Sequence, residues 1–350
     1  MKKIVVIQLI VFVLIAAGFY GKAISEEKKK EEPLYNSSLH YTGKGMSYWY
    51  DKTNGGLENL TGIPYSNLDC KNCHVTSCDA CHRTVINERP AYSKMVARKQ
   101  DTCLHCHKRE ASILQIDSTA NQQNVHSAKG MECMDCHTAR EMHGDGIEYK
   151  SMKQIGAMDA NCEKCHPSVN PSISHKVHRE KLDCKACHVR HVVSCSNCHF
   201  ETLVKEGKRV AIPLSGWVFL MNYNGKVTSA NMQNFVVSYN KTFLMFAPQN
   251  SHSIMKQGRK CDDCHATETV KKIREGKLNL IWLENGVVKN VKGVIPVVDG
   301  VIYDSTYQNY KDGKWIPIEN PPAPVIHYAA FGEPLSKEQL KKLSMPMGKK

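Results

Sequence analysis

The chain has 350 residues, a formal net charge of +13 and 16 cysteines, and only 7% of its residues are aromatic. Such a charge is typical of proteins that bind nucleic acid or an anionic membrane surface. The cysteines, however, all fall into eight short units of one pattern. No cysteine is left over for a disulfide, a catalytic thiol or a separate metal site.

The first residues predict export. Lys2 and Lys3 precede an apolar run, and Gly21-Lys22-Ala23 is a small-x-small sequence suited to signal peptidase. We expect residues 1–23 to be a signal peptide cleaved after Ala23. An uncleaved N-terminal anchor is the alternative, because the apolar run is close to the shortest that spans a bilayer.

Residues 24–66 are predicted to be a linker and N-terminal arm. A Lys/Glu run up to residue 32 has no apolar periodicity and favours a solvated linker. The aromatic cluster at residues 46–50 follows it. These side chains either flank a cofactor or pack as an ordinary arm.

The repeated unit is Cys-x-x-Cys-His, and we number its eight copies motif 1 to motif 8 in chain order. Composition alone would produce roughly 0.035 such units by chance. The pattern is the attachment signature of c-type haem, in which two thiols bond the vinyl groups and the histidine ligates iron. Zinc also uses paired cysteines, but it does not require a histidine after each pair.

The motifs predict eight covalently bound haem c groups. Their thioether cysteines are Cys70, Cys73, Cys78, Cys81, Cys103, Cys106, Cys133, Cys136, Cys162, Cys165, Cys184, Cys187, Cys195, Cys198, Cys261 and Cys264. The proximal iron ligands are His74, His82, His107, His137, His166, His188, His199 and His265. Motifs 6 and 7 form the densest cluster, with further histidines around them.

Eight haems change how charge and length are interpreted. Their sixteen propionates offset most of the basic side chains, which removes the argument for a nucleic-acid partner. About 41 residues serve each haem, too few for a large side-chain core. We therefore expect a multihaem cytochrome c fold, in which the macrocycles form the interior and short α-helices and loops wrap them.

The chain order predicts five further segments. Residues 67–205 form a seven-haem core and residues 206–250 a β insertion, in which Asn224-Gly225 is the turn of a hairpin. Residues 251–268 carry the eighth haem. Residues 269–330 form a β-rich region, and residues 331–350 a C-terminal tail whose short helix ends near Leu343.

Nine histidines lie outside the ligand position of the motifs. His105, inside motif 3, is the poorest candidate for a distal ligand. The other eight match eight open iron faces: His40, His126, His143, His175, His178, His191, His252 and His327. His126, His178 and His252 are tethered too closely to their nearest motif to reach its far face, so we expect them to ligate other haems.

The number of distal ligands separates two functions. An iron with two imidazoles is closed and only changes its oxidation state, whereas an enzyme needs one accessible iron. His40 and His327 lie nearest the chain ends. If either does not ligate, or ligates a haem of a neighbouring subunit, one iron stays accessible.

The eight motifs over residues 70–265, the segment 126–146 and the crowded pair after His178 resemble octahaem c-type cytochromes. That group includes octahaem tetrathionate reductase and, more distantly, hydroxylamine oxidoreductase. The resemblance implies a stacked haem chain in the periplasm or at the cell surface. In those enzymes a lysine or a cross-linked tyrosine marks one special haem, but no lysine or tyrosine here matches those positions.

Two functions follow as hypotheses. The first is an electron carrier of anaerobic respiration, which takes electrons from membrane quinol-oxidising or other cytochrome donors and passes them to redox partner proteins or extracellular acceptors. A homo-oligomer or filament belongs to this hypothesis. The second is an octahaem reductase of small sulfur or nitrogen oxyanions such as tetrathionate or nitrite, or of hydroxylamine, acting at one accessible haem.

Overall fold

The computed structural model describes residues 34–68, 75–178, 180–206, 209–237 and 241–346. The predicted leader, the Lys/Glu linker and all of motif 1 therefore lie outside the described residues. Within these ranges, no helix has both the length and the apolar character needed to cross a bilayer.

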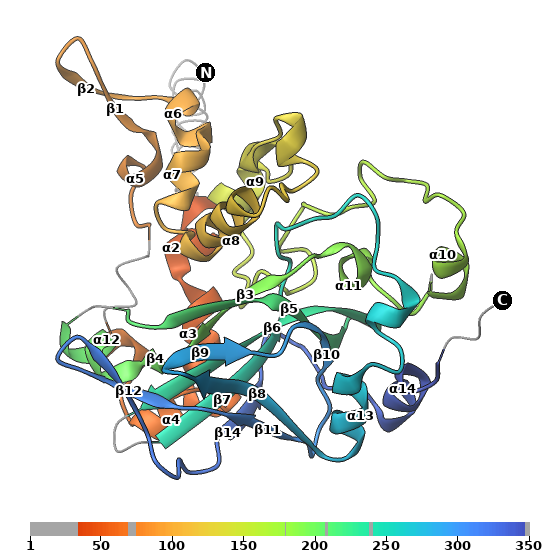
Figure 1. Ribbon diagram of the computed structural model, residues 1–350. Coiled ribbons are helices and arrows are strands. Elements are labelled where there is room, and N and C mark those ends of the chain that lie inside the picture. The colour runs from red at the N-terminus through yellow and green to blue at the C-terminus, as the bar shows by residue number, and fades with distance from the viewer. Residues whose placement is uncertain (1–33, 69–74, 179, 207–208, 238–240, 347–350) are drawn as a thin grey trace, which may run out of the picture.

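Up to residue 190 the chain consists mainly of short helices and the loops between them, and α8 is the longest of these helices (Figure 1). Ser93, Thr138 and Asp183 accept hydrogen bonds from backbone N–H groups at three helix starts. The elements are η1 (Leu34–Ser37), α2 (Leu39–Thr42), α3 (Lys44–Tyr50), η2 (Lys52–Asn54), α4 (Glu58–Thr61), η3 (Tyr65–Asn67), α5 (Asp79–His82), β1 (Arg83–Ile86), β2 (Arg89–Tyr92), α6 (Lys94–Arg98), α7 (Gln100–Leu104), α8 (Lys108–Thr119), η5 (Ser127–Lys129), η6 (Cys133–Asp135), α9 (Ala139–His143), α10 (Ile173–His178) and α11 (Cys184–His188).

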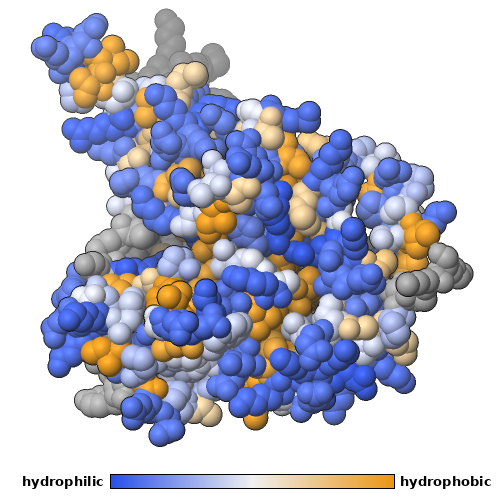
Figure 2. Space-filling model, in the orientation of Figure 1, coloured by the Kyte–Doolittle hydropathy of each residue, from blue (hydrophilic) through white to orange (hydrophobic). Residues whose placement is uncertain are grey.

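The β1–β2 hairpin projects from this part of the molecule (Figure 1). On the face shown in Figure 2, hydrophilic residues predominate, and hydrophobic residues show on the hairpin and among the hydrophilic ones of the lower half. In β1, Val85 and Ile86 are 67% and 55% exposed.

Strands dominate from residue 192 onward. They are β3 (Val192–Ser196), β4 (Cys198–His199), β5 (Ile212–Tyr223), β6 (Lys226–Val237), β7 (Lys241–Pro248), β8 (Lys277–Glu284), β9 (Val287–Asn290), β10 (Gly293–Pro296), β11 (Ile302–Ser305), β12 (Gln308–Lys311), β13 (Lys314–Pro317) and β14 (Val325–Tyr328). Helices α12 (Phe200–Glu206), α13 (Glu268–Arg274) and α14 (Lys337–Leu343) and the short turn η8 (Cys261–Asp263) lie between or after them.

The predicted hairpins are confirmed. Tyr223 pairs with Lys226 across Asn224 and Gly225, both of which have positive φ, as a type I′ turn requires. The predicted helix of the C-terminal tail is also confirmed, because α14 ends at Leu343 and begins with a capping box between Ser336 and Gln339.

The two predicted β blocks are not separate. One sheet has the order β10-β5-β6-β7-β14, with β3 paired to β5 and β4 paired to β6. Strands β10 and β14 come from the predicted β-rich region, and β3 and β4 come from the predicted seven-haem core. The boundaries drawn at residues 205, 250 and 269 therefore do not separate folding units. Parallel pairing of β10 with β5 and of β14 with β7 joins segments that are distant in sequence.

The expectation of no large side-chain core is wrong for the strand-rich part. Trp217, Phe219 and Phe246 are fully buried, and they belong to one apolar cluster that extends from Ala186 to Leu335. The physical reason is the uneven distribution of motifs. Seven lie before residue 200, so the last 150 residues serve a single motif and have enough apolar side chains to bury one another.

Replacing Gly225 by alanine is expected to lower the free energy of unfolding by about 1 kcal/mol. Its φ of 74° is costly for any residue with a Cβ atom, although the space around it is open. The measurement is urea denaturation of the purified protein, followed by circular dichroism. Gly45, in α3, is the matched control, since a Cβ there meets only Leu39 at 3.8 Å. Equal destabilisation by Gly45→Ala would contradict this explanation.

Candidate haem-ligand pairs

Six proximal histidines each have one candidate distal histidine beside them. The ring centroids are 6.0 to 6.3 Å apart in every case. The pairs are His82–His143 (motif 2), His107–His40 (motif 3), His137–His252 (motif 4), His166–His126 (motif 5), His188–His175 (motif 6) and His265–His178 (motif 8).

This centroid separation is the one expected for two imidazoles that ligate one iron atom from opposite sides. Metal–imidazole bonds of about 2 Å on both sides put the ring centroids about 6 Å apart. Ordinary aromatic contacts range more widely, over about 4.5–7 Å. Six pairs within 0.3 Å of one another, each uniting one motif histidine with one other histidine, fit the haem better than six unrelated contacts.

The three histidines that are close in sequence to a motif lie, as predicted, beside the histidine of another motif. His126, His178 and His252 lie against motifs 5, 8 and 4, none of which is the nearest motif in sequence. His143 ends α9, and Gly144, with a φ of 78°, turns the chain directly after it. His40 faces His107 of its own chain, so the filament hypothesis has only His327 as its cross-subunit ligand.

Second hydrogen bonds orient several of these rings. The Nδ1 atoms of His175, His178, His188 and His265 lie 2.7 to 3.2 Å from backbone carbonyl oxygens. A carbonyl can only accept, so each Nδ1 carries the proton. The Nε2 atom of each ring then has its lone pair available for a metal.

Motif 4 differs, because carboxylates replace the carbonyls on both rings. His137 Nδ1 lies 2.6 Å from Glu141 Oε2, and His252 Nδ1 lies 2.6 Å from Glu110 Oε2. Burial alone would lower the pKa of His252, but the hydrogen bond that it donates to Glu110, together with the negative charge of that carboxylate, outweighs burial and raises the pKa. Burial would raise the pKa of Glu141, but the bond to His137 and backbone N–H groups lower it.

His191 is placed differently from the prediction. It is buried, and its Nε2 lies 2.9 Å from Asp117 Oδ1 in α8. Ser253 and Arg190 contact the same carboxylate oxygen, at 2.9 and 3.1 Å. Its Nε2 is thus already used in a buried polar network, and only its Nδ1, which is buried without a hydrogen-bond partner among the described residues, is left for a metal. No sequence pattern indicates this, because Asp117 is 74 residues away.

His327, on β14, lies against Phe243 and not against a motif histidine of the described residues. Its Nε2 is buried and has no hydrogen-bond partner among the described residues, and burial lowers its pKa. Its ring lies 6.1 Å from Phe243. Phe243 packs in a cluster with Leu68, which is two residues before Cys70. The described residues before motif 1 therefore end close to His327.

The sheet keeps His327 away from motif 7. His199 lies on β4 and His327 on β14, and the strands between them are β6 and β7. Three strand-to-strand steps amount to about 14 Å. This is more than twice the ring separation within the histidine pairs.

The residues around motif 7 were not predicted from the sequence. Cys195, Cys198 and His199 lie in β3 and β4, and the ring against His199 is the phenol of Tyr310, with centroids 6.4 Å apart. Nearby, Asn197 Nδ2 and Gln308 Oε1 are buried without hydrogen-bond partners within the described ranges. The β12–β13 hairpin, which is distant in sequence, contacts this motif through Gln308 and Tyr310, so no local pattern predicts these neighbours. His105, as expected, is exposed in motif 3.

Cysteines of successive motifs lie beside one another. The Cys133 thiol is the largest influence on the pKa of Cys103, which it lowers, and the Cys162 thiol does the same to Cys184. Burial, and after it a thiol of another motif, raises the pKa of Cys81, Cys136 and Cys264; these neighbouring thiols are those of Cys103, Cys165 and Cys187. The neighbouring thiols indicate one order, through motifs 2, 3, 4, 5, 6 and 8.

Comparison with known proteins gives one limited similarity. Over 85 residues the chain is 29% identical to a protein named cytochrome c-552 from Haemophilus ducreyi. The match covers 23% of this chain and 17% of that protein. No protein-family model matches the chain. No solved structure matches it either.

Proposed function

We propose that the chain is an octahaem c-type cytochrome that carries electrons in the periplasm or at the cell surface. The observation that supports this most strongly is the set of six histidine pairs with the separation of two imidazoles across an iron. Residues that would hold the haems are the motif cysteines and the paired histidines. The haem would supply one-electron chemistry, and closed irons favour a carrier over an enzyme.

The path of neighbouring cysteines supports a relay. Thioether bonds at Cys103 and Cys133 would fix the edges of two haems side by side, and Cys162 and Cys184 would do the same for two others. Electrons would then move through motifs 2 to 6 and on to motif 8. The proposed donors are membrane quinol-oxidising proteins or other cytochromes, and the proposed acceptors are redox partners or extracellular electron acceptors.

The test is the haem content and spin state of the protein purified from a host that attaches haem c. We expect an intact mass that exceeds the polypeptide by eight haems, and a pyridine haemochrome spectrum typical of haem c. The six histidine pairs, together with His327, predict seven low-spin irons by electron paramagnetic resonance. A colourless protein, or fewer than eight haems in the intact mass, would overturn the proposal.

A second candidate function, a reductase of small sulfur or nitrogen oxyanions, is favoured by one feature. Tyr310 lies against His199, and buried polar atoms of Asn197 and Gln308 lie beside motif 7. A polar site with a phenol is suited to an oxyanion approaching a metal. A high-spin signal that changes on adding tetrathionate, nitrite or hydroxylamine, and that is altered in Tyr310→Phe, would support the reductase over the carrier.

A further inference from the structure

The haem of motif 4 has second hydrogen bonds unlike those of the other paired motifs. Both of its imidazoles donate to carboxylates, His137 to Glu141 and His252 to Glu110, each at 2.6 Å. In motifs 6 and 8, both rings donate to backbone carbonyls instead. The difference lies in the chemistry of the acceptor, and it is found on both faces of one haem.

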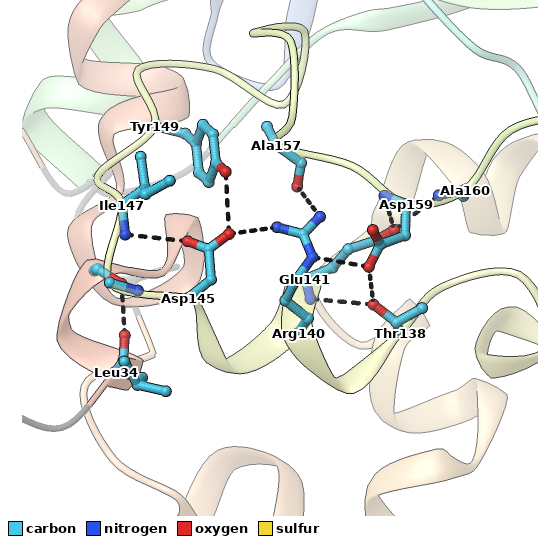
Figure 3. A network of polar contacts seen from close by, with 12 residues as sticks. Leu34, Thr138, Arg140, Glu141, Asp145, Ile147, Tyr149, Ala157, Asp159 and Ala160 are labelled. Atoms are coloured by element: carbon cyan, nitrogen blue, oxygen red, sulfur yellow. Dashed lines mark hydrogen bonds and ion pairs between the residues drawn. The ribbon is translucent and has the colours of Figure 1, made fainter.

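Glu141 is held firmly in its place. Its side chain is 1% exposed, and its other oxygen, Oε1, accepts from the backbone N–H groups of Asp159 and Ala160. Figure 3 shows this carboxylate pointing toward the Asp159–Ala160 backbone, beside the Arg140–Asp159 ion pair. A carboxylate fixed in this way cannot turn away from His137, so the hydrogen bond persists in both oxidation states.

A carboxylate acceptor draws the Nδ1 proton and increases the electron density at Nε2, which makes the imidazole a stronger donor to iron. A stronger donor stabilises the ferric more than the ferrous state, and so lowers the reduction potential. We propose that Glu110 and Glu141 act as positioning residues which make the motif 4 haem the lowest in potential among the six haems with paired histidines. This inference depends on the proposed function, because it requires haem at motif 4.

In the neighbouring motif 3, the surroundings of one axial histidine favour a higher reduction potential. The Nδ1 atom of His40 is buried and has no hydrogen-bond partner among the described residues. That imidazole is the weaker donor, which favours a higher potential. The Cys103–Cys133 contact places motifs 3 and 4 side by side. The expected order of potentials is therefore motif 4 lowest, motifs 6 and 8 intermediate, and motif 3 highest.

A low potential at motif 4 would make electron transfer through the middle of the relay energetically unfavourable. In the proposed relay, motif 4 stands between motifs 2 and 3 on one side and motifs 5, 6 and 8 on the other. Electrons would fill the haems on both sides before they occupy motif 4. The reduced protein would thus hold electrons on two separate groups of haems. Each transfer between the groups would pass through the motif 4 haem, whose reduction is the least favourable.

The experiment is a redox titration of the haem-loaded protein, followed by electron paramagnetic resonance. The signal of motif 4 is identified as the one that His252→Met alters. We expect Glu110→Gln and Glu141→Gln each to raise the reduction equilibrium constant of that haem about tenfold, which is about 59 mV for one electron. The double variant should raise it further.

Glu132→Gln is the matched control. It removes a carboxylate one residue before Cys133, where no axial histidine is hydrogen-bonded to it. Glu110→Gln remains informative if Glu141→Gln fails to fold, because Glu110 is partly exposed on α8. Unchanged potentials in protein carrying eight haems, or an equal shift in Glu132→Gln, would overturn the inference. Protein without haem would overturn the proposed function instead.

Discussion

Replacing His327 by alanine is expected to convert one low-spin haem iron to high spin, whereas replacing His191 by alanine is expected to convert none. The sequence gives both histidines the same role. In the structure, His327 presents an unpartnered, buried Nε2 near the chain that leads into motif 1, while the Nε2 of His191 is bound to Asp117. Where the Nδ1 of a paired histidine is hydrogen-bonded, Nε2 is the atom left for iron, and His327 has its Nε2 unpartnered among the described residues. His191 has only its buried Nδ1 left.

Electron paramagnetic resonance of the oxidised variants provides the measurement. Added imidazole should return the His327→Ala iron to low spin, because it can occupy the vacated position. His327→Met is the second variant, and it should keep the iron low-spin with a raised potential. A new high-spin iron in His191→Ala, together with an unchanged spectrum in His327→Ala, would reverse the assignment.

Replacing Asp117 by alanine is expected to destabilise the protein by about 3 kcal/mol, since it leaves buried polar partners without their carboxylate. His191, Ser253 and Arg190 all lie within 3.1 Å of Asp117 Oδ1. These contacts join α8 to β3 and to the loop that carries His252. The loss should therefore appear both in unfolding by guanidinium and in a broader motif 4 signal.

The pH dependence of stability gives a second measurement of the same site. Burial alone would raise the pKa of Asp117, but the bonds from His191 and Ser253 and the charge of Arg190 lower it overall. A carboxyl with a lowered folded pKa stabilises the protein above the ordinary carboxyl range, and that contribution is lost as the pH falls through the folded value. Asp117→Ala should thus lose its difference from wild type in acid. Asp101→Ala, on an exposed residue of α7, is the control and should change little.

Much of the local structure follows from the sequence alone. The eight motifs are complete within five residues each, so the haem attachment prediction needs no long-range information. The Asn224-Gly225 turn and the Ser336–Gln339 capping box are equally local, and the structure confirms both. A tight turn or a helix start is decided by the φ preferences and hydrogen bonds of four or five neighbouring residues.

Tertiary structure alone decided which histidine meets which. His252 lies beside His137 and His178 beside His265, across 115 and 87 residues, and nothing in the spacing of the motifs selects these partners. The same applies to Glu110 beside His252, to Asp117 beside His191 and to Tyr310 beside His199. The sequence by itself determined how many haem-attachment motifs the chain has and which atoms they offer, because each motif is local. Their pairing, surroundings and potentials depend on how distant strands and helices pack, which no local pattern encodes.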